Sequence, residues 1–237
     1  TAPPTERPAV HSFTFVVQEG AVVDAAAYTS ELRHLGVSTA EIHRLRLRLS
    51  LVGGTRRAVL VVEGSSVSLE LRPLAPMPQE IAVAAQPVRD ERTTPAFVGP
   101  DLGWQRLELA QAGADEGLLV DATGRVVSAI MNPLLLLRHG AAYVSSHEHT
   151  SASIALDGVV DILAGQGVEV RHLDGGFVRS DLLTSEVWVV DPLCGARLVT
   201  SWLEYGTRRP ARRWVERREV PTHREVNELR RGRATPL

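Results

Sequence analysis

Apolar side chains recur along this chain at two spacings, every second residue and every third or fourth residue. The first spacing is typical of strands and the second of helices. In the first half of the chain, strands are expected over residues 12–18, 57–63, 66–72 and 81–85. Helices are expected over residues 24–34 and 39–50, the second because Ile42, Leu45 and Leu49 would share one face.

The second half of the chain continues this pattern. Strands are expected over residues 116–121, 125–131, 134–137, 141–145, 168–172, 186–190 and 196–201. Helices are expected over residues 101–111, 153–163 and 177–183. A chain that mixes strands and helices in this way is predicted to have an α+β fold (α/β, with two domains).

Shifts in composition suggest where the domains begin and end. Residues 1–11 are rich in proline and polar side chains and are expected to form a loose N-terminal arm. Residues 89–100 have no periodicity and contain prolines and charges, which is typical of a linker. We therefore expect a smaller N-terminal α+β domain over residues 12–88 and a larger C-terminal domain over residues 101–237.

The tail from residue 206 to residue 237 carries ten arginines. It could be a nucleic-acid-binding arm or a solvated amphipathic helix with pairs of opposite charge one turn apart. Glutamates interleave with the arginines and no set of stacking aromatic residues accompanies them, which favours the solvated helix.

Composition excludes several function classes. All 26 basic residues are arginine and none is lysine, so no lysine of this sequence can form a Schiff base. A formal net charge of -2 gives no drive towards nucleic acid or anionic membranes. The single cysteine excludes an intrachain disulfide and a Cys-rich zinc site, and no apolar run is long enough to span a membrane. We expect a cytoplasmic protein without a metal.

Residues 90–205 carry an ordered set of motifs. They are Arg92-Thr93-Thr94-Pro95, Gly99-Pro100-Asp101-Leu102, the run 112–121 (AGADEGLLVD), Thr123-Gly124-Arg125-Val126-Val127, Gly167-Val168-Glu169-Val170, Ser185-Glu186-Val187-Trp188 and Leu193-Cys194-Gly195-Ala196-Arg197. This order resembles the fold-type IV pyridoxal-phosphate (PLP) enzymes, which include branched-chain and D-amino-acid aminotransferases and aminodeoxychorismate lyase. The resemblance covers most of residues 12–205. It implies a fold-type IV aminotransferase-like fold, a homodimer and a cleft between the two domains.

The sequence departs from this family where the family holds its cofactor. The family's Schiff-base lysine corresponds to Val98, and its glutamate beside the pyridine nitrogen corresponds to Ser128. The phosphate-binding segment, which carries a threonine in the family, corresponds to residues 153–155 and begins with Ser153. The family's His-x-x-Arg pair corresponds to Tyr28 and Glu31. With these four features missing, the resemblance implies a PLP-independent homologue without a cofactor.

Cys194 is a candidate nucleophile. In the family, the loop that holds Asp191, Cys194 and Arg197 borders the cleft. A Cys-His-Asp set made with Asp191 and His147 or His149 would support acyl transfer or cyclisation through a thioester. A lone cysteine is more often a small buried apolar residue, and that alternative stays open.

The segment Ser-Ser-His-Glu-His-Thr contributes two further candidates, His147 and His149. They could act in acid–base catalysis, oriented by Glu148 or Glu31, or they could bind a metal. A third metal ligand is not identifiable, and a solvated polar loop is the remaining alternative. Arg197 could bind the carboxylate of a substrate or could be a surface arginine.

These observations predict a cofactor-independent enzyme that carries out elimination, cyclisation or acyl transfer on a small anionic or acyl substrate, with specialised biosynthesis as the expected setting. Its substrate pocket is expected near Arg197, Ser128, Ser153, Tyr28, Val98 and Met131. Two alternatives remain, a non-catalytic binding or partner subunit and an enzyme that uses PLP without a covalent bond.

Overall fold

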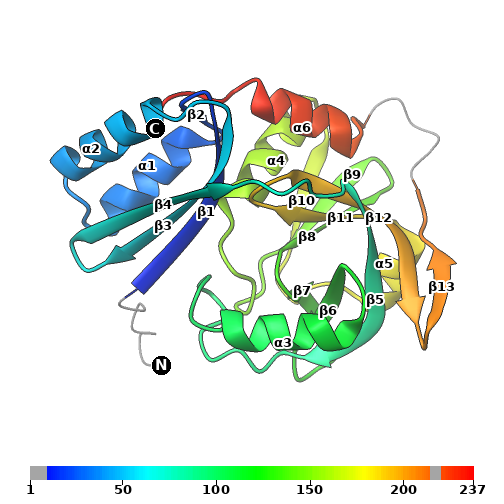
Figure 1. Cartoon of the computed structure of the whole chain (residues 1–237). Coiled ribbons are helices and arrows are strands. Elements are labelled where there is room, and N and C mark those ends of the chain that lie inside the picture. Colours follow the sequence, from blue (N-terminus) through cyan, green and yellow to red (C-terminus); the bar gives the residue numbers. More distant parts are fainter. Residues whose placement is uncertain (1–9, 214–219) are drawn as a thin grey trace.

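The computed structural model describes residues 10–213 and 220–237, which form two sheets with helices packed against them (Figure 1). The smaller sheet has the strand order β2-β1-β3-β4. Its strands are β1 (Val10–Gln18), β2 (Ala21–Val22), β3 (Thr55–Glu63) and β4 (Ser66–Pro73). Two helices, α1 (Ala25–His34) and α2 (Thr39–Ser50), cover one face of this sheet.

The smaller sheet and its helices share one apolar core. In α2 the predicted positions Ile42, Leu45 and Leu49 are buried, and the Ser38 side chain caps the helix by accepting a hydrogen bond from the Glu41 N–H at 3.2 Å. In β3 every second side chain, from Ala58 to Val62, is buried against these helices. The alternation in β3 and the helical spacing in α2 both place apolar side chains on the face toward this core, as the sequence predicted.

The larger sheet has nine strands in the described part of the chain, in the order β10-β9-β8-β11-β12-β5-β6-β7, with β13 beside β12. They are β5 (Glu80–Arg89), β6 (Glu116–Val120), β7 (Val126–Ala129), β8 (Leu134–Arg138), β9 (Ala141–Ser145), β10 (Glu169–Leu173), β11 (Glu186–Asp191), β12 (Gly195–Glu204) and β13 (Thr207–Pro210). The helices that accompany it are α3 (Leu102–Ala112), α4 (Ile154–Gly165), α5 (Arg179–Thr184) and α6 (His223–Arg231).

The mixed α+β architecture is confirmed, but β5 lies in the larger sheet and not in the smaller domain to which residues 80–88 were assigned. It runs parallel to both β12 and β6. Residues 81–85 are all buried because both faces of this strand are covered, which explains their unbroken apolar run. The chain therefore crosses between the sheets at residues 74–79, and residues 89–100 form a loop after β5.

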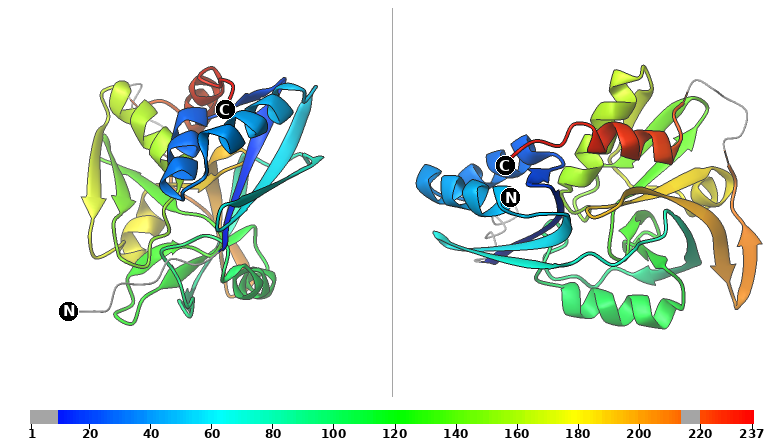
Figure 2. Two further views of the ribbon diagram at one scale, coloured as in Figure 1. Left: turned by 90° about the vertical axis from the view of Figure 1, so that its left-hand side faces the viewer. Right: turned by 45° about the horizontal axis from the view of Figure 1, so that its top comes forward.

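The tail contains the amphipathic helix that the sequence favoured, α6, but one face of this helix is buried and the helix takes up only part of the tail. Another part of the tail forms the exposed strand β13, and α6 packs on α4 and β12 (Figure 2), with Val226 fully buried. Thr235 pairs with Val22 through backbone hydrogen bonds, and Leu237 lies in the core of the smaller sheet. The tail thus bridges the two sheets. Residues 1–9 of the expected arm and residues 214–219 lie outside the described residues.

No helix within residues 10–213 and 220–237 is long and apolar enough to cross a membrane.

Candidate active site

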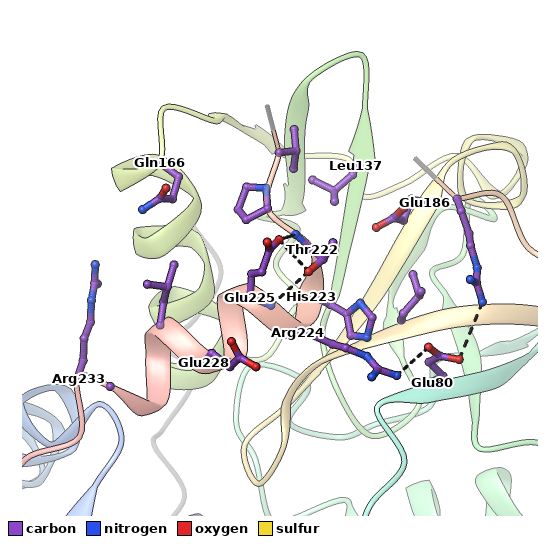
Figure 3. Close-up of a pocket in the computed structure, with 16 residues that line it drawn as sticks. Glu80, Leu137, Gln166, Glu186, Thr222, His223, Arg224, Glu225, Glu228 and Arg233 are labelled. Carbon is purple, nitrogen blue, oxygen red and sulfur yellow. Dashed lines mark hydrogen bonds and ion pairs between the residues drawn. The ribbon is translucent and has the colours of Figure 1, made fainter. Parts of the chain in front are cut away.

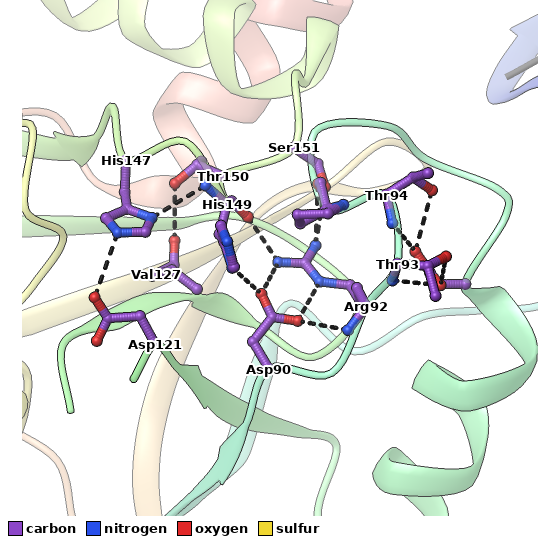
Figure 4. Close-up of polar contacts among 12 residues, drawn as sticks. Asp90, Arg92, Thr93, Thr94, Asp121, Val127, His147, His149, Thr150 and Ser151 are labelled. Carbon is purple, nitrogen blue, oxygen red and sulfur yellow. Dashed lines mark hydrogen bonds and ion pairs between the residues drawn. The ribbon is translucent and has the colours of Figure 1, made fainter. Parts of the chain in front are cut away.

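The parallel strands β5 and β6 end side by side, and each is followed by a carboxylate, Asp90 and Asp121 respectively. The Asp90 N–H donates to the Val120 carbonyl at 2.8 Å, which keeps the two strand ends together. The loop that follows β9 runs over these ends and brings His147 and His149 to the carboxylates (Figure 4). Three segments that are distant in sequence thus meet at one edge of the larger sheet.

Asp90 and Arg92 form an ion pair with almost no solvent contact, since their side chains are 0% and 3% exposed. Arg92 Nε and Nη2 donate to Asp90 Oδ1 and Oδ2, each at 2.8 Å. The other guanidinium N–H groups donate to the His149 carbonyl at 2.7 Å and to Ser151 Oγ at 3.0 Å. Burial opposes ionisation of Asp90, but the hydrogen bonds and charge of Arg92 hold its pKa below the usual value.

His149 is oriented by this pair. Its Nδ1 lies 3.1 Å from Asp90 Oδ2. Because the ionised Asp90 can only accept, Nδ1 carries a hydrogen, and in the neutral ring the lone pair is then on Nε2. Nε2 has no hydrogen-bond partner among the described residues, and the side chain is 35% exposed. His149 therefore presents a proton-accepting nitrogen to solvent.

His147 has both ring nitrogens engaged. Nδ1 accepts a hydrogen bond from the His149 backbone N–H at 3.0 Å, so the hydrogen is on Nε2, which lies 3.4 Å from Asp121 Oδ2. Burial opposes ionisation of Asp121, but hydrogen bonds from Thr123 and the Arg125 N–H lower its pKa. The two imidazole rings meet edge to face with their centroids 5.3 Å apart. His147 thus holds the loop and the ring of His149 in place.

The carboxylates that orient the histidines are Asp90 and Asp121, whereas the sequence suggested Glu148 or Glu31. Among the described residues, no hydrogen bond or ion pair joins either glutamate to a histidine ring. Reasoning from sequence also missed Arg92 as a site residue, although its motif was noticed. The sequence pattern assigns the charges just after β5 to a linker, because it does not show that β5 pairs with β6.

Cys194 lies in the turn between β11 and β12, apart from the histidines. Asp191 Oδ1 accepts hydrogen bonds from the Leu193 and Cys194 backbone N–H groups, at 2.7 and 3.2 Å, and so shapes the turn. Burial and the Asp191 carboxylate raise the pKa of the thiol to about 12. The structure brings Asp191 to Cys194 but shows no contact between Cys194 and an imidazole within the described residues.

Cys194 is therefore expected to react slowly with iodoacetamide near neutral pH. A shift from 9.0 to about 12 lowers the thiolate fraction about a thousandfold. The greater nucleophilicity of the more basic thiolate offsets about twentyfold of this, which leaves alkylation about fiftyfold slower. Intact-mass kinetics against pH measure it, with Cys194→Ser/Ser65→Cys supplying an exposed thiol as control. Equal alkylation rates for the wild type and the control variant would contradict this prediction and make Cys194 a candidate nucleophile again.

Met131 contacts a buried carboxylate, Glu116 from β6, whose ionised form is also stabilised by the charge of Arg197. Arg197 is 6% exposed and donates from Nε to the Pro78 carbonyl at 3.0 Å. The Met131 N–H and Asn132 Nδ2 donate to Glu116 at 3.2 and 2.8 Å. Burial raises the pKa of Glu116 to about 7, against these hydrogen bonds. Arg197 is thus buried beside a protein carboxyl group and is not the surface arginine that the sequence left open.

The remaining candidates have structural contacts. Ser128 is buried in β7, and its hydroxyl donates to the Asn132 carbonyl at 3.0 Å. Ser153 caps α4 by accepting from the Leu156 N–H at 3.1 Å. Tyr28 is buried against Phe15, and burial raises the pKa of its hydroxyl above the usual value. Glu31 lies half-buried on α1.

Two cavities lie elsewhere. A groove of about 1350 Å³ follows α6, where Arg224 approaches Glu80 (Figure 3), and a cavity of about 210 Å³ lies between β8, β9 and α5. None of the candidate residues expected from the sequence lines either cavity. Within the described ranges, no group of three or more His, Cys, Asp or Glu side chains could hold a metal ion.

No family model and no curated protein matches this chain, but solved structures share its fold. A proposed 4-amino-4-deoxychorismate lyase is 24% identical over 82% of this chain and 85% of its own, with a TM-score of 0.66. A proposed branched-chain amino acid aminotransferase from Thermotoga maritima is 14% identical over 92% and 83%, with a TM-score of 0.71.

A hypothetical aminotransferase from Mycobacterium tuberculosis, with α-ketoglutarate and PMP bound, is 13% identical over 98% of this chain and 94% of its own, with a TM-score of 0.69. These likenesses show the fold alone. The chain has the fold-type IV aminotransferase-like fold, which confirms the fold predicted from its motifs.

The side chains at the positions that correspond to the family's cofactor contacts do not fit PLP. Val98, which is 49% exposed, offers no amine. The Ser128 hydroxyl is committed to the Asn132 carbonyl and cannot supply a negative charge to a pyridine nitrogen. The resemblance aligns Glu31 with an arginine that binds phosphate in the family, and a carboxylate there would repel phosphate.

Proposed function

We propose that this protein is a PLP-independent enzyme on the fold-type IV fold, in which His149 is the general acid–base. The observation that carries the proposal is the chain of contacts from Arg92 through Asp90 to His149 Nδ1, with Nε2 left open. A small anionic metabolite is the proposed substrate class. The homodimer implied by the resemblance is retained as part of the proposal.

The geometry supports proton transfer more directly than nucleophilic attack. His149 accepts a proton at Nε2 and becomes an imidazolium, whose Nδ1–H still donates to Asp90. The carboxylate of Asp90 stabilises this cation, and Arg92 keeps Asp90 ionised. The proton is then returned to the leaving group or to the product. Elimination and cyclisation both need such a step, whereas the raised pKa of Cys194 disfavours a thioester route.

The purified protein is expected to bind no PLP, because no lysine can hold it and the corresponding side chains do not fit it. Visible absorbance and native mass spectrometry after incubation with PLP measure this. The Val98→Lys variant is a matched positive control for imine formation, since it adds one amine at the position that corresponds to the family's lysine. A stoichiometric noncovalent complex with the unmodified protein would contradict PLP independence and favour external-aldimine chemistry.

The acid–base function is tested with a substrate panel followed by proton NMR in D2O. The panel contains 4-amino-4-deoxychorismate, branched-chain amino acids with α-ketoglutarate, and carboxylic acids without an amine. Loss of a C–H signal or a new product identifies the reaction. Preference for the amine-free acids supports the proposal, whereas turnover that survives the loss of His149 contradicts it.

A further inference from the structure

Arg230 of α6 and Asp24, which precedes α1, form a second buried ion pair far from His149 in the sequence. Arg230 Nε and Nη2 donate to the single oxygen Asp24 Oδ2, at 2.9 and 2.6 Å. Their side chains are 7% and 14% exposed. The pair joins the helices of the smaller sheet to the helix that packs on the larger sheet.

The backbone at Asp24 is strained in a way that serves this contact. Its φ is 59°, a left-handed conformation that few residues other than glycine adopt. Asp24 occupies the N-cap position of α1, yet its side chain makes no hydrogen bond to that helix. The residue thus accepts strain and leaves a cap unmade while its carboxylate is held by Arg230, which points to a role for the pair.

Neighbouring residues leave room for both groups. A Cβ added to Gly158 of α4 would lie 2.7 Å from Asp24 Oδ1. A Cβ added to Gly195 would lie 3.2 Å from Arg230 Nη1 and 2.3 Å from Asn227 Oδ1. Asn227 in turn exchanges two hydrogen bonds of 2.8 Å with the backbone of Ala196, which anchors α6 on β12. The helix that carries Arg230 is therefore anchored on β12 by a contact that does not involve Asp24.

We infer that Arg230 is the centre of a binding site for a small carboxylate, and that the carboxylate of Asp24 occupies this site as an internal ligand. Arg230 extends from α6, which Asn227 anchors on β12, and two glycines keep the space clear. Two N–H groups aimed at one oxygen are what a free carboxylate would also find there. Asp24 closes the site to other anions and fastens the smaller sheet to α6.

The test opens the site by replacing Asp24 with glycine, which also tolerates the left-handed backbone. Asp24→Gly is expected to lower the Tm by about 10 °C, because Arg230 is left buried and unpaired. Formate at about ten times its dissociation constant then raises the Tm of this variant by about 4 °C. Chloride at the same ionic strength does not.

Three comparisons make the result specific to the site. Asp24→Asn fills the same space without the charge, so it is destabilised but not rescued by formate. Asp24→Gly/Arg230→Met has no guanidinium and is not rescued either. Formate does not raise the Tm of the wild type, because the Asp24 carboxylate already occupies the site. A formate effect of equal size in all four proteins, or none in Asp24→Gly, overturns the inference.

If Asp24→Gly is too unstable to purify, a second test addresses the same inference. If the two groups are ligand and site, Asp24→Asn/Arg230→Gln is expected to have a higher Tm than Asp24→Asn alone, because no charge is left unpaired. A double variant no more stable than Asp24→Asn contradicts the inference. Neither test depends on the chemistry of His149.

Discussion

The Arg92→Met variant is expected to lose about 3–5 kcal/mol of its free energy of unfolding. The reason is that Asp90, with a side chain that is 0% exposed, would lose its paired guanidinium, so its carboxyl group must take up a proton or stay charged in a buried site. The His149 carbonyl and Ser151 Oγ would lose their donors as well. Urea unfolding followed by circular dichroism measures the change.

A matched control for Arg92 is Arg72→Met, which removes another arginine paired with a carboxylate two residues earlier. That pair, formed by Arg72 and Glu70, is 51% and 59% exposed, so its loss is expected to leave the free energy of unfolding almost unchanged. If the two variants lose similar stability, the Asp90–Arg92 pair does not organise this edge of the sheet. The site proposed around His149 would then have no buried ion pair that fixes its geometry.

The His149→Asn variant is expected to lower kcat about 10²- to 10⁴-fold on a substrate that the panel identifies. Asparagine can still donate to Asp90 but has no group to accept a proton in place of Nε2. The fold and the 147–150 loop should therefore persist while proton transfer is lost. Steady-state kinetics with wild type and variant, each over a range of pH, measure the effect.

His139→Asn is the control for this substitution, because His139 is exposed and its φ of 51° suits asparagine. It should leave kcat unchanged. Nitrogen-15 NMR of labelled histidine gives a readout independent of activity, in which His149 carries its hydrogen on Nδ1 and His147 on Nε2. The opposite tautomers, or a His149→Asn variant with wild-type kcat, would rule out His149 as the general acid–base.

Local patterns along the chain were sufficient for most helices and strands. The spacing of Ile42, Leu45 and Leu49 predicted α2, and alternation predicted β1, β3 and β4. Such patterns do not indicate which strands a given strand pairs with. The run 81–85 looks the same whether it joins one sheet or the other, because periodicity records burial and not the identity of the neighbour.

The candidate site likewise combines residues that the sequence indicates with residues that only folding brings to them. His147 and His149 could be selected by residue type, but Asp90 lies 59 positions from His149 in the sequence. Nothing in either segment indicates the other. Cys194 and the histidines, which the sequence combined, share no contact among the described residues, since Cys194 belongs to the β11–β12 turn and the histidines follow β9.

The sequence by itself determined what the protein lacks and which elements it forms. The absence of lysine from 237 residues needs no structure, and neither does helical or alternating periodicity, because both are properties of residue type and of short-range spacing. Only the tertiary structure decided the partners of β5 and the carboxylates that orient the two histidines. It also decided the contact between Arg230 and Asp24. These depend on hydrogen bonds and charges between segments brought together by folding, and no local pattern encodes which distant segment a side chain will meet.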